Sequence, residues 1–117
     1  MNDKTRKLPF DVLDSGRAIR HWRTGRTYEE YLSDRQFRRA VEREFEIIGE
    51  ALNRLSADDA GVAAQIAELP RIVAFRNRII HGYDSVDDAS VWGVIEKHLP
   101  PLVGQAENLL KASGEVV

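Results

Sequence analysis

Apolar side chains recur at helical spacing along most of the chain, and this pattern predicts an all-α protein. The clearest series lies in the segment 34–56, whose apolar positions fall three or four residues apart: Phe37, Val41, Phe45, Ile48, Leu52 and Leu55. Such spacing places an apolar stripe along one side of a long helix. No segment alternates apolar and polar positions as a half-buried β-strand does, and no repeat or linker interrupts the chain.

Capping and breaking residues delimit the other predicted helices. We expect helices at about 9–23, 27–33 and 68–81, and a short helix or turn at 57–67. Pro9 suits the first turn of its helix, where a backbone N–H has no helical partner in any case. Thr27 and Glu30 form the pattern of a capping box, and Gly82 stands where glycine often ends a helix.

The last predicted helix begins near Asp87-Asp88, whose carboxylates suit a helix N-terminus, and it continues to Leu109. Pro100-Pro101 should kink this helix or split it in two. Four main helices with short connections indicate an antiparallel up-and-down bundle, to which short helices are added. We expect residues 1–117 to form a single domain.

The composition narrows the classes of function. The chain has 117 residues, no cysteine, 31% charged residues and a formal net charge of -2. The lack of cysteine excludes thiol chemistry and Cys-ligated metal sites, and it fits a reducing compartment. A mildly acidic chain is not a general nucleic-acid coat, so any contact with RNA must be local. No apolar run approaches the roughly 18 residues of a membrane span, and the first residues lack a signal-peptide core, so we expect a cytoplasmic protein.

One segment concentrates the candidate chemistry where an apolar helix ends. Arg76, His81 and Tyr83 form the pattern Arg-x-x-x-x-His-x-Tyr. An arginine can bind phosphate, a histidine can move a proton near neutral pH, and a tyrosine offers a hydroxyl for modification. Asn77 lies one turn before His81, and Arg78 falls on the polar side of the helix as a solvated or RNA-facing charge. We find no Gly-rich phosphate loop and no metal-ligand pattern.

Arg76 falls within the apolar arc of its predicted helix, where an unpaired charge is costly. Two interpretations stay open: an internal salt bridge, for which Glu44 is a candidate, or a position at an interface or cleft that binds a phosphate. On an ideal helix Arg76 and His81 are about 140° apart. They can therefore converge only if the last turn unwinds, or if two copies of the motif meet across a two-fold axis.

Plain structural roles for the same residues also stay open. His81 suits the C-terminus of a helix because of the helix dipole, Tyr83 can pack at the end of a bundle, and Asn77 can lie on the helix surface. The remaining histidines, His21 and His98, are expected in structural or surface positions. The tryptophans, Trp22 and Trp92, are expected in the core or at a dimer interface.

The segment Arg76-Asn77-Arg78-Ile79-Ile80-His81-Gly82-Tyr83 resembles the signature of the HepT-like toxins, within the HEPN superfamily of small helical ribonucleases. Two flanking segments are also similar to that family: Glu46-Ile47-Ile48-Gly49-Glu50-Ala51 on the long helix, and Val86-Asp87 to Val91-Trp92. The resemblance implies a five-helix bundle that pairs as a symmetric homodimer, with the two motifs facing each other across one composite cleft.

The resemblance further implies a metal-independent endoribonuclease that needs no cofactor and acts as the toxin of a bacterial toxin–antitoxin pair. Arg76 would hold the scissile phosphate of the RNA, and His81 would be the general base or acid. Asn77 would orient His81 or bind the phosphate. The partner would be a MntA-like nucleotidyltransferase antitoxin, which transfers AMP from ATP to Tyr83 and so blocks the site by charge and bulk.

Two rival functions use the same residues differently. The chain could be a non-catalytic nucleotide- or RNA-binding partner of a minimal nucleotidyltransferase, in which case Tyr83 matters and the imidazole of His81 does not. It could also be a structural dimerisation bundle. That function predicts that Arg76→Ala unfolds or dissociates the protein, whereas a catalytic role predicts a folded and inactive dimer.

Overall fold

The computed structural model describes residues 1–82, 84 and 86–117, and all regular structure in this part of the chain is helical. The helices in chain order are α1 (Asp3–Arg23), α2 (Tyr28–Ser33), α3 (Arg35–Asp58), α4 (Ala60–Ala63), α5 (Leu69–His81), α6 (Asp88–Lys97) and α7 (Leu99–Ala112). The all-α class predicted from the apolar spacing is therefore confirmed.

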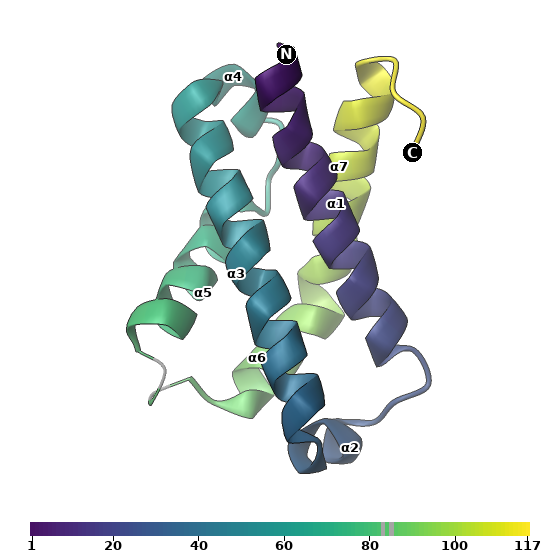
Figure 1. The fold of residues 1–117 in the computed structure, drawn as a ribbon, viewed down its shortest axis with the longest axis vertical. Coiled ribbons are helices and arrows are strands. Elements are labelled where there is room, and N and C mark those ends of the chain that lie inside the picture. Colours follow the sequence, from purple (N-terminus) through teal and green to yellow (C-terminus); the bar gives the residue numbers. More distant parts are fainter. Residues whose placement is uncertain (83, 85) are drawn as a thin grey trace.

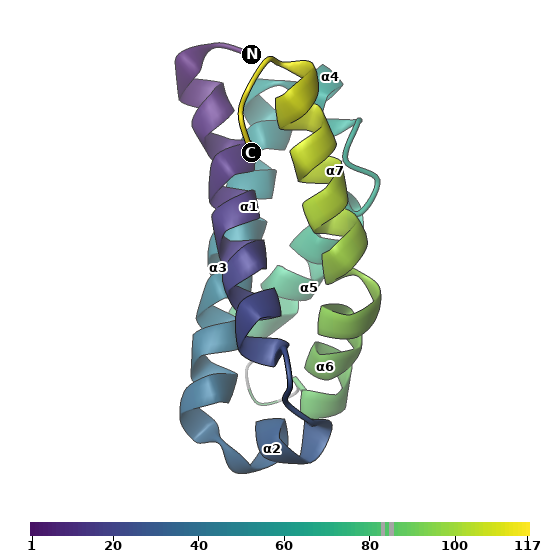
Figure 2. The same cartoon turned by 90° about the vertical axis from the view of Figure 1, so that its right-hand side faces the viewer.

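Long helices run along the 42 Å axis of the molecule, and the short ones lie at its ends. α1 packs against both α3 and α7, and α5 packs against the other side of α3. Figures 1 and 2 show α2 and α6 at the end opposite the two chain termini, with α4 at the same end as the termini. α5 runs back along α3, so the C-terminal half of α5 lies beside the middle of α3 (Figure 1).

The apolar stripe of α3 forms the centre of the core, as its spacing predicts. Every apolar residue of the series that defined this helix is buried. The rings of Phe45 on α3 and Phe75 on α5 meet edge to face at 5.1 Å between centroids, which is a favoured aromatic geometry. Trp92 is buried against the ring of Tyr31, 5.5 Å away, so its predicted core position is confirmed.

α1 begins earlier than the sequence indicates. The helix starts at Asp3, and the Asn2 side chain caps it by accepting a hydrogen bond from the Thr5 N–H at 2.7 Å. Pro9 therefore lies inside the helix rather than in its first turn, which corrects our prediction. The apolar periodicity misses this start because its first residues are mostly polar and charged.

The other predicted boundaries are close to those observed. The last helix is split at His98 into α6 and α7, with Pro100 in the first turn of α7. Thr27 and Glu30 form the capping box at the start of α2. α5 ends at His81 as expected, but Gly82 has φ of -131°, so the helix ends there without the left-handed conformation that favours glycine.

Candidate functional site

The structure places Arg76 in the seam between α5 and α3, where its aliphatic stem lies over Gly49. Arg76 is only 8% exposed. A Cβ atom at position 49 would stand 2.3 Å from both Cβ and Cγ of Arg76, far inside the contact distance of two carbon atoms. Glycine at position 49 therefore lets α5 approach closely enough to bury this arginine.

The charge of Arg76 is compensated by a carboxylate on the next residue of α3. Nη1 of Arg76 donates to Oε2 of Glu50 at 3.2 Å, and Nε of Arg54 donates to the other oxygen, Oε1, at 2.8 Å. The hydrogen bond from Arg54, followed by that from Arg76, holds the pKa of Glu50 below its usual range. One ionised carboxylate thus bridges two guanidinium groups.

Glu44 is not the partner of Arg76. Our first interpretation, an internal salt bridge, therefore named the wrong carboxylate. Glu44 instead accepts a hydrogen bond from the Ser15 hydroxyl on α1, at 3.3 Å. The reason is the rotation of α3, because residues 44 and 49 differ by about 140° around the helix. Gly49 faces α5, so the side chain that can reach over to Arg76 comes from Glu50. The internal salt bridge exists, but with a different carboxylate.

Arg76 has hydrogen-bonding capacity beyond its contact with Glu50. A guanidinium has five N–H donors in one plane, and the bond to Glu50 uses Nη1. Its Nε is buried and has no hydrogen-bond partner among the described residues. Leaving such a donor unpaired costs free energy, and functional sites are one place where this cost is found.

The other candidate residues of α5 lie on its outer side. Asn77, Arg78 and His81 are exposed. The last turn keeps its helical form, since the Gly82 N–H donates to the Arg78 carbonyl at 2.9 Å. Arg76 and His81 therefore keep their separation of about 140° around the axis, and the unwinding of the last turn that we considered does not occur. Ile80, beside them, is 41% exposed.

The segment after α5 leads into the capped start of α6. Asp87 accepts hydrogen bonds from the backbone N–H of Ser90 at 2.7 Å and from its hydroxyl at 2.8 Å, so the predicted cap is confirmed. These bonds lower the pKa of Asp87, with a smaller contribution from the charge of Arg78. Tyr83 lies outside the described residues, so its position and its modification stay predictions.

Comparison with known proteins identifies the family. The profile of the family described as "Ribonuclease HepT-like" matches residues 12–109, a range that includes the Arg76 seam and the end of α5. The chain belongs to the HepT-like ribonuclease family. The resemblance that rested on Arg76, His81 and the flanking segments is thus confirmed over most of the chain.

The HepT-like chain is also similar to curated proteins of archaea and bacteria. It is 30% identical to the "Probable ribonuclease HepT" of Thermococcus cleftensis, over 86% of this chain and 91% of that protein. It is 26% identical to a "Putative RNase" of Methanocaldococcus jannaschii over 91% and 87% of the two chains, and 30% identical to a "Putative RNase" of Caldanaerobacter subterraneus over 74% and 77%. No solved structure gives a significant match.

A second histidine of this HepT-like chain lies at the other end of α5. Nδ1 of His98 is 3.2 Å from Oε2 of Glu68, and Nε2 of His98 is 3.4 Å from Nη1 of Arg71. Nε of Arg71 is also 3.8 Å from the same Glu68 oxygen. Sequence reasoning found no partner for His98, because the three residues meet only when α5 packs beside the junction of α6 and α7. His21 is exposed, as expected.

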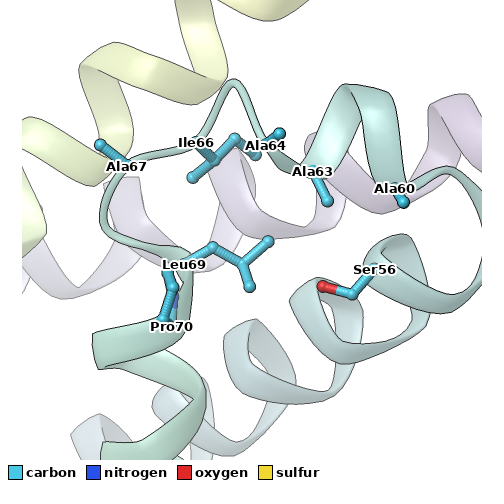
Figure 3. A pocket seen from close by; sticks show the side chains of 8 residues that line it. All are labelled: Ser56, Ala60, Ala63, Ala64, Ile66, Ala67, Leu69 and Pro70. Atoms are coloured by element: carbon cyan, nitrogen blue, oxygen red, sulfur yellow. The ribbon is translucent and has the colours of Figure 1, made fainter.

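An apolar hollow of about 340 Å³ opens near the start of α5, where α3 and α4 also meet (Figure 3). It is lined by small and apolar side chains: Ser56, Ala60, Ala63, Ala64, Ile66, Ala67, Leu69 and Pro70. The Ser56 hydroxyl already donates to the Leu52 carbonyl at 3.2 Å. This lining offers no charge to recognise a phosphate, so the hollow is not a candidate for RNA chemistry.

Residues 1–82, 84 and 86–117 contain neither a metal-binding cluster nor a membrane-spanning helix. Within this part of the chain, no three His, Asp or Glu side chains are grouped in a way that could hold a metal ion. No helix of the same part has both the length and the apolar character needed to cross a membrane.

Proposed function

We propose that this HepT-like chain is a metal-independent endoribonuclease with Arg76 and His81 as its catalytic residues. The observation that carries the proposal is a buried arginine with an unpaired N–H donor on the same helix as an exposed histidine. A fixed guanidinium suits the negative charge that develops on a phosphate. An accessible imidazole suits proton transfer near neutral pH.

The proposed reaction uses the nucleophile that RNA itself supplies. His81 takes the proton of a 2′-hydroxyl, and the freed oxygen attacks the adjacent phosphorus. The bond from phosphorus to the 5′-oxygen breaks, which leaves a 2′,3′-cyclic phosphate and a 5′-hydroxyl. A second His81 protonates the departing oxygen. Arg76 donates to the non-bridging oxygens, Asn77 orients the imidazole or binds the phosphate, and Arg78 contacts the RNA backbone.

We place the reaction between two copies of the chain. Arg76 and His81 lie on different sides of a regular α5, which supports a site where one copy supplies the arginine and the other the histidine. The exposed Ile80 beside the motif supports an apolar contact at the same face. Dimers that combine an Arg76→Ala chain with a His81→Ala chain should then regain part of the activity that each variant lacks alone. Mixed dimers as inactive as either variant would contradict the shared site.

We further propose that the chain is the toxin of a toxin–antitoxin pair, silenced by a MntA-like nucleotidyltransferase. The Tyr83 hydroxyl would attack the α-phosphorus of ATP, losing its proton and releasing pyrophosphate. The added AMP brings negative charge two residues from His81, where it repels the RNA phosphate. Expressed beside the nucleotidyltransferase, Tyr83→Phe should remain toxic and wild type should not. Equal protection of both would contradict control through Tyr83.

The ribonuclease proposal is tested with purified protein, EDTA and a short RNA, next to the same RNA with one 2′-deoxy position. Wild type should cut the RNA, leave cyclic phosphate ends and spare the deoxy position. His81→Ala should be slower by about 100-fold or more, as expected for loss of a general base or acid.

His21→Ala is the matched control, because it removes another exposed histidine of the same chain. It should cleave RNA like wild type. If wild type leaves RNA intact while Tyr83 still accepts AMP, the non-catalytic partner of a nucleotidyltransferase becomes the better account.

A further inference from the structure

We propose that Glu50 is a positioning residue that fixes the guanidinium of Arg76 for phosphate binding. The effect of Glu50 on catalysis rests on the ribonuclease function proposed above. The effect of Glu50 on the position of Arg76 does not depend on that function. Glu50 lies outside the Arg-x-x-x-x-His-x-Tyr motif, on α3 rather than on α5.

Within the described residues, little besides Glu50 holds the head of Arg76. The stem of Arg76 is confined by Gly49, whose lack of a side chain leaves room for the arginine and nothing more. The guanidinium donates from Nη1 to Glu50 at 3.2 Å, and Nε has no partner in the described part of the chain. The guanidinium of Arg76 is planar, so its bond to Glu50 also sets the direction of the N–H donors that Glu50 does not use. Phosphate oxygens could bind these donors.

Glu50 is itself held in place. Nε of Arg54, one turn further along α3, donates to Oε1 of Glu50 at 2.8 Å. Oε2 is then left to face Arg76. The two arginines keep the carboxylate ionised by lowering its pKa. Each oxygen of the Glu50 carboxylate thus accepts a hydrogen bond from a different arginine, although the side chain is 48% exposed.

In the part of the chain that the structure describes, two other glutamates of α3, Glu42 and Glu46, form ion pairs only within their own helix. Glu42 pairs with Arg39 at 3.0 Å and Glu46 pairs with Arg43 at 3.2 Å, so both interact with arginines of their own helix. Such exposed pairs contribute little to stability. Glu50 makes a similar local pair and also reaches across the seam to α5. The additional contact orients a buried group of another helix.

The test compares Glu50→Gln and Glu50→Ala with Glu46→Gln. The control removes the same charge from the same helix, one turn earlier, without touching Arg76. On RNA, Glu50→Ala should lower kcat by roughly tenfold or more, because a displaced catalytic group is costly, while KM changes less than about twofold. Glu50→Gln should lose less, since its amide oxygen still accepts from Nη1. Glu46→Gln should match wild type.

Two kinetic outcomes would overturn the proposal. If both Glu50 variants cleave like wild type, the carboxylate does not position Arg76. If Glu50→Gln lowers KM and raises the rate, Glu50 competes with the RNA phosphate instead of preparing its site.

A second readout separates this proposal from the ribonuclease function. The Nε–H signal of Arg76 can be assigned in NMR spectra from its loss in Arg76→Lys. In both Glu50 variants this signal should shift and exchange faster with water, while Glu46→Gln leaves it unchanged. If wild type cleaves no RNA, the proposed function falls and this signal alone decides the role of Glu50. An unchanged signal in Glu50→Ala overturns the proposal even if the nuclease is active.

Discussion

The two ends of α5 carry the same three kinds of side chain in opposite arrangements. A histidine, an arginine and a glutamate lie near each end of this helix. Near its start they are His98, Arg71 and Glu68. Toward its end they are His81, Arg76 and Glu50. At the start, the imidazole lies against both of its charged neighbours. Toward the end, the arginine and the glutamate pair, and the histidine stands exposed on another side of the helix.

This difference indicates that the residues at the start of α5 have a structural role and that those toward its end are candidates for a reactive site. Both ring nitrogens of His98 face charged neighbours of the same chain, since Nδ1 lies 3.2 Å from Glu68 and Nε2 lies 3.4 Å from Arg71. This group joins α5 to the α6–α7 junction, and its imidazole is enclosed by its own chain. At the other end, Nε of Arg76 is buried without a hydrogen-bond partner among the described residues, while His81 is exposed, so a binding partner from outside can reach the imidazole.

A large effect on RNA cleavage should come from Arg76→Lys, and none from Arg71→Lys at the other end of α5. Arg76→Lys keeps the charge but loses the planar fork that binds phosphate oxygens in pairs. We expect RNA cleavage to slow by about 100-fold, comparable to the loss of one donor to a developing negative charge. Arg71→Lys is the control, and because its side chain is largely exposed it should leave the cleavage rate unchanged. Equal cleavage rates for Arg76→Lys and Arg71→Lys would contradict the assignment of the reactive site to the C-terminal end of α5.

A smaller effect is expected from filling the space under Arg76. In Gly49→Ala the new methyl group would overlap the arginine stem, and overpacking should cost about 1–3 kcal/mol of unfolding free energy. Gly93→Ala is the matched control, because a methyl group on this helical glycine of α6 would meet no atom of the described residues within 4 Å. It should stabilise the protein by about 0.5–1 kcal/mol. Thermal unfolding of both variants measures the difference, and a stable Gly49→Ala would contradict the close seam.

Sequence patterns predicted the helices and singled out Arg76, but they missed the contacts that bind distant segments. The position of Arg76 in an apolar arc left two interpretations open, and the internal salt bridge of the first one exists. The candidate partner Glu44 was wrong, because the partner depends on how α3 is rotated against α5, and periodicity within one helix does not fix that angle. Gly49 belongs to a segment that resembles the family, but only the approach of α5 reveals why a side chain is excluded there.

The smallest effect concerns a buried polar group at neither end of α5. The Tyr31 hydroxyl is buried and has no hydrogen-bond partner among the described residues, so Tyr31→Phe removes an unsatisfied polar group and should raise the unfolding free energy by about 1 kcal/mol at neutral pH.

A pH dependence follows from the same burial. Burial raises the pKa of Tyr31. The raised value means that the neutral phenol contributes stability below the unfolded-state pKa of about 10, and that this contribution is lost as the pH rises toward the folded-state value. Wild type should therefore lose stability above that pH more steeply than Tyr31→Phe in chemical unfolding. Parallel alkaline curves would show that folding does not raise the pKa of Tyr31, and would contradict the burial of its hydroxyl.

The most direct test of the account makes one substitution at each end of α5 and measures both RNA cleavage and unfolding. His81→Ala should lose at least about 100-fold in cleavage and keep its unfolding temperature, because the side chain is exposed. His98→Ala should keep cleavage and lose about 1–3 kcal/mol, because it removes a largely buried imidazole that packs against Glu68 and Arg71 and joins α5 to the α6–α7 junction. If His98→Ala abolishes cleavage while remaining stable, and His81→Ala cleaves normally, the reactive end of α5 has been assigned wrongly.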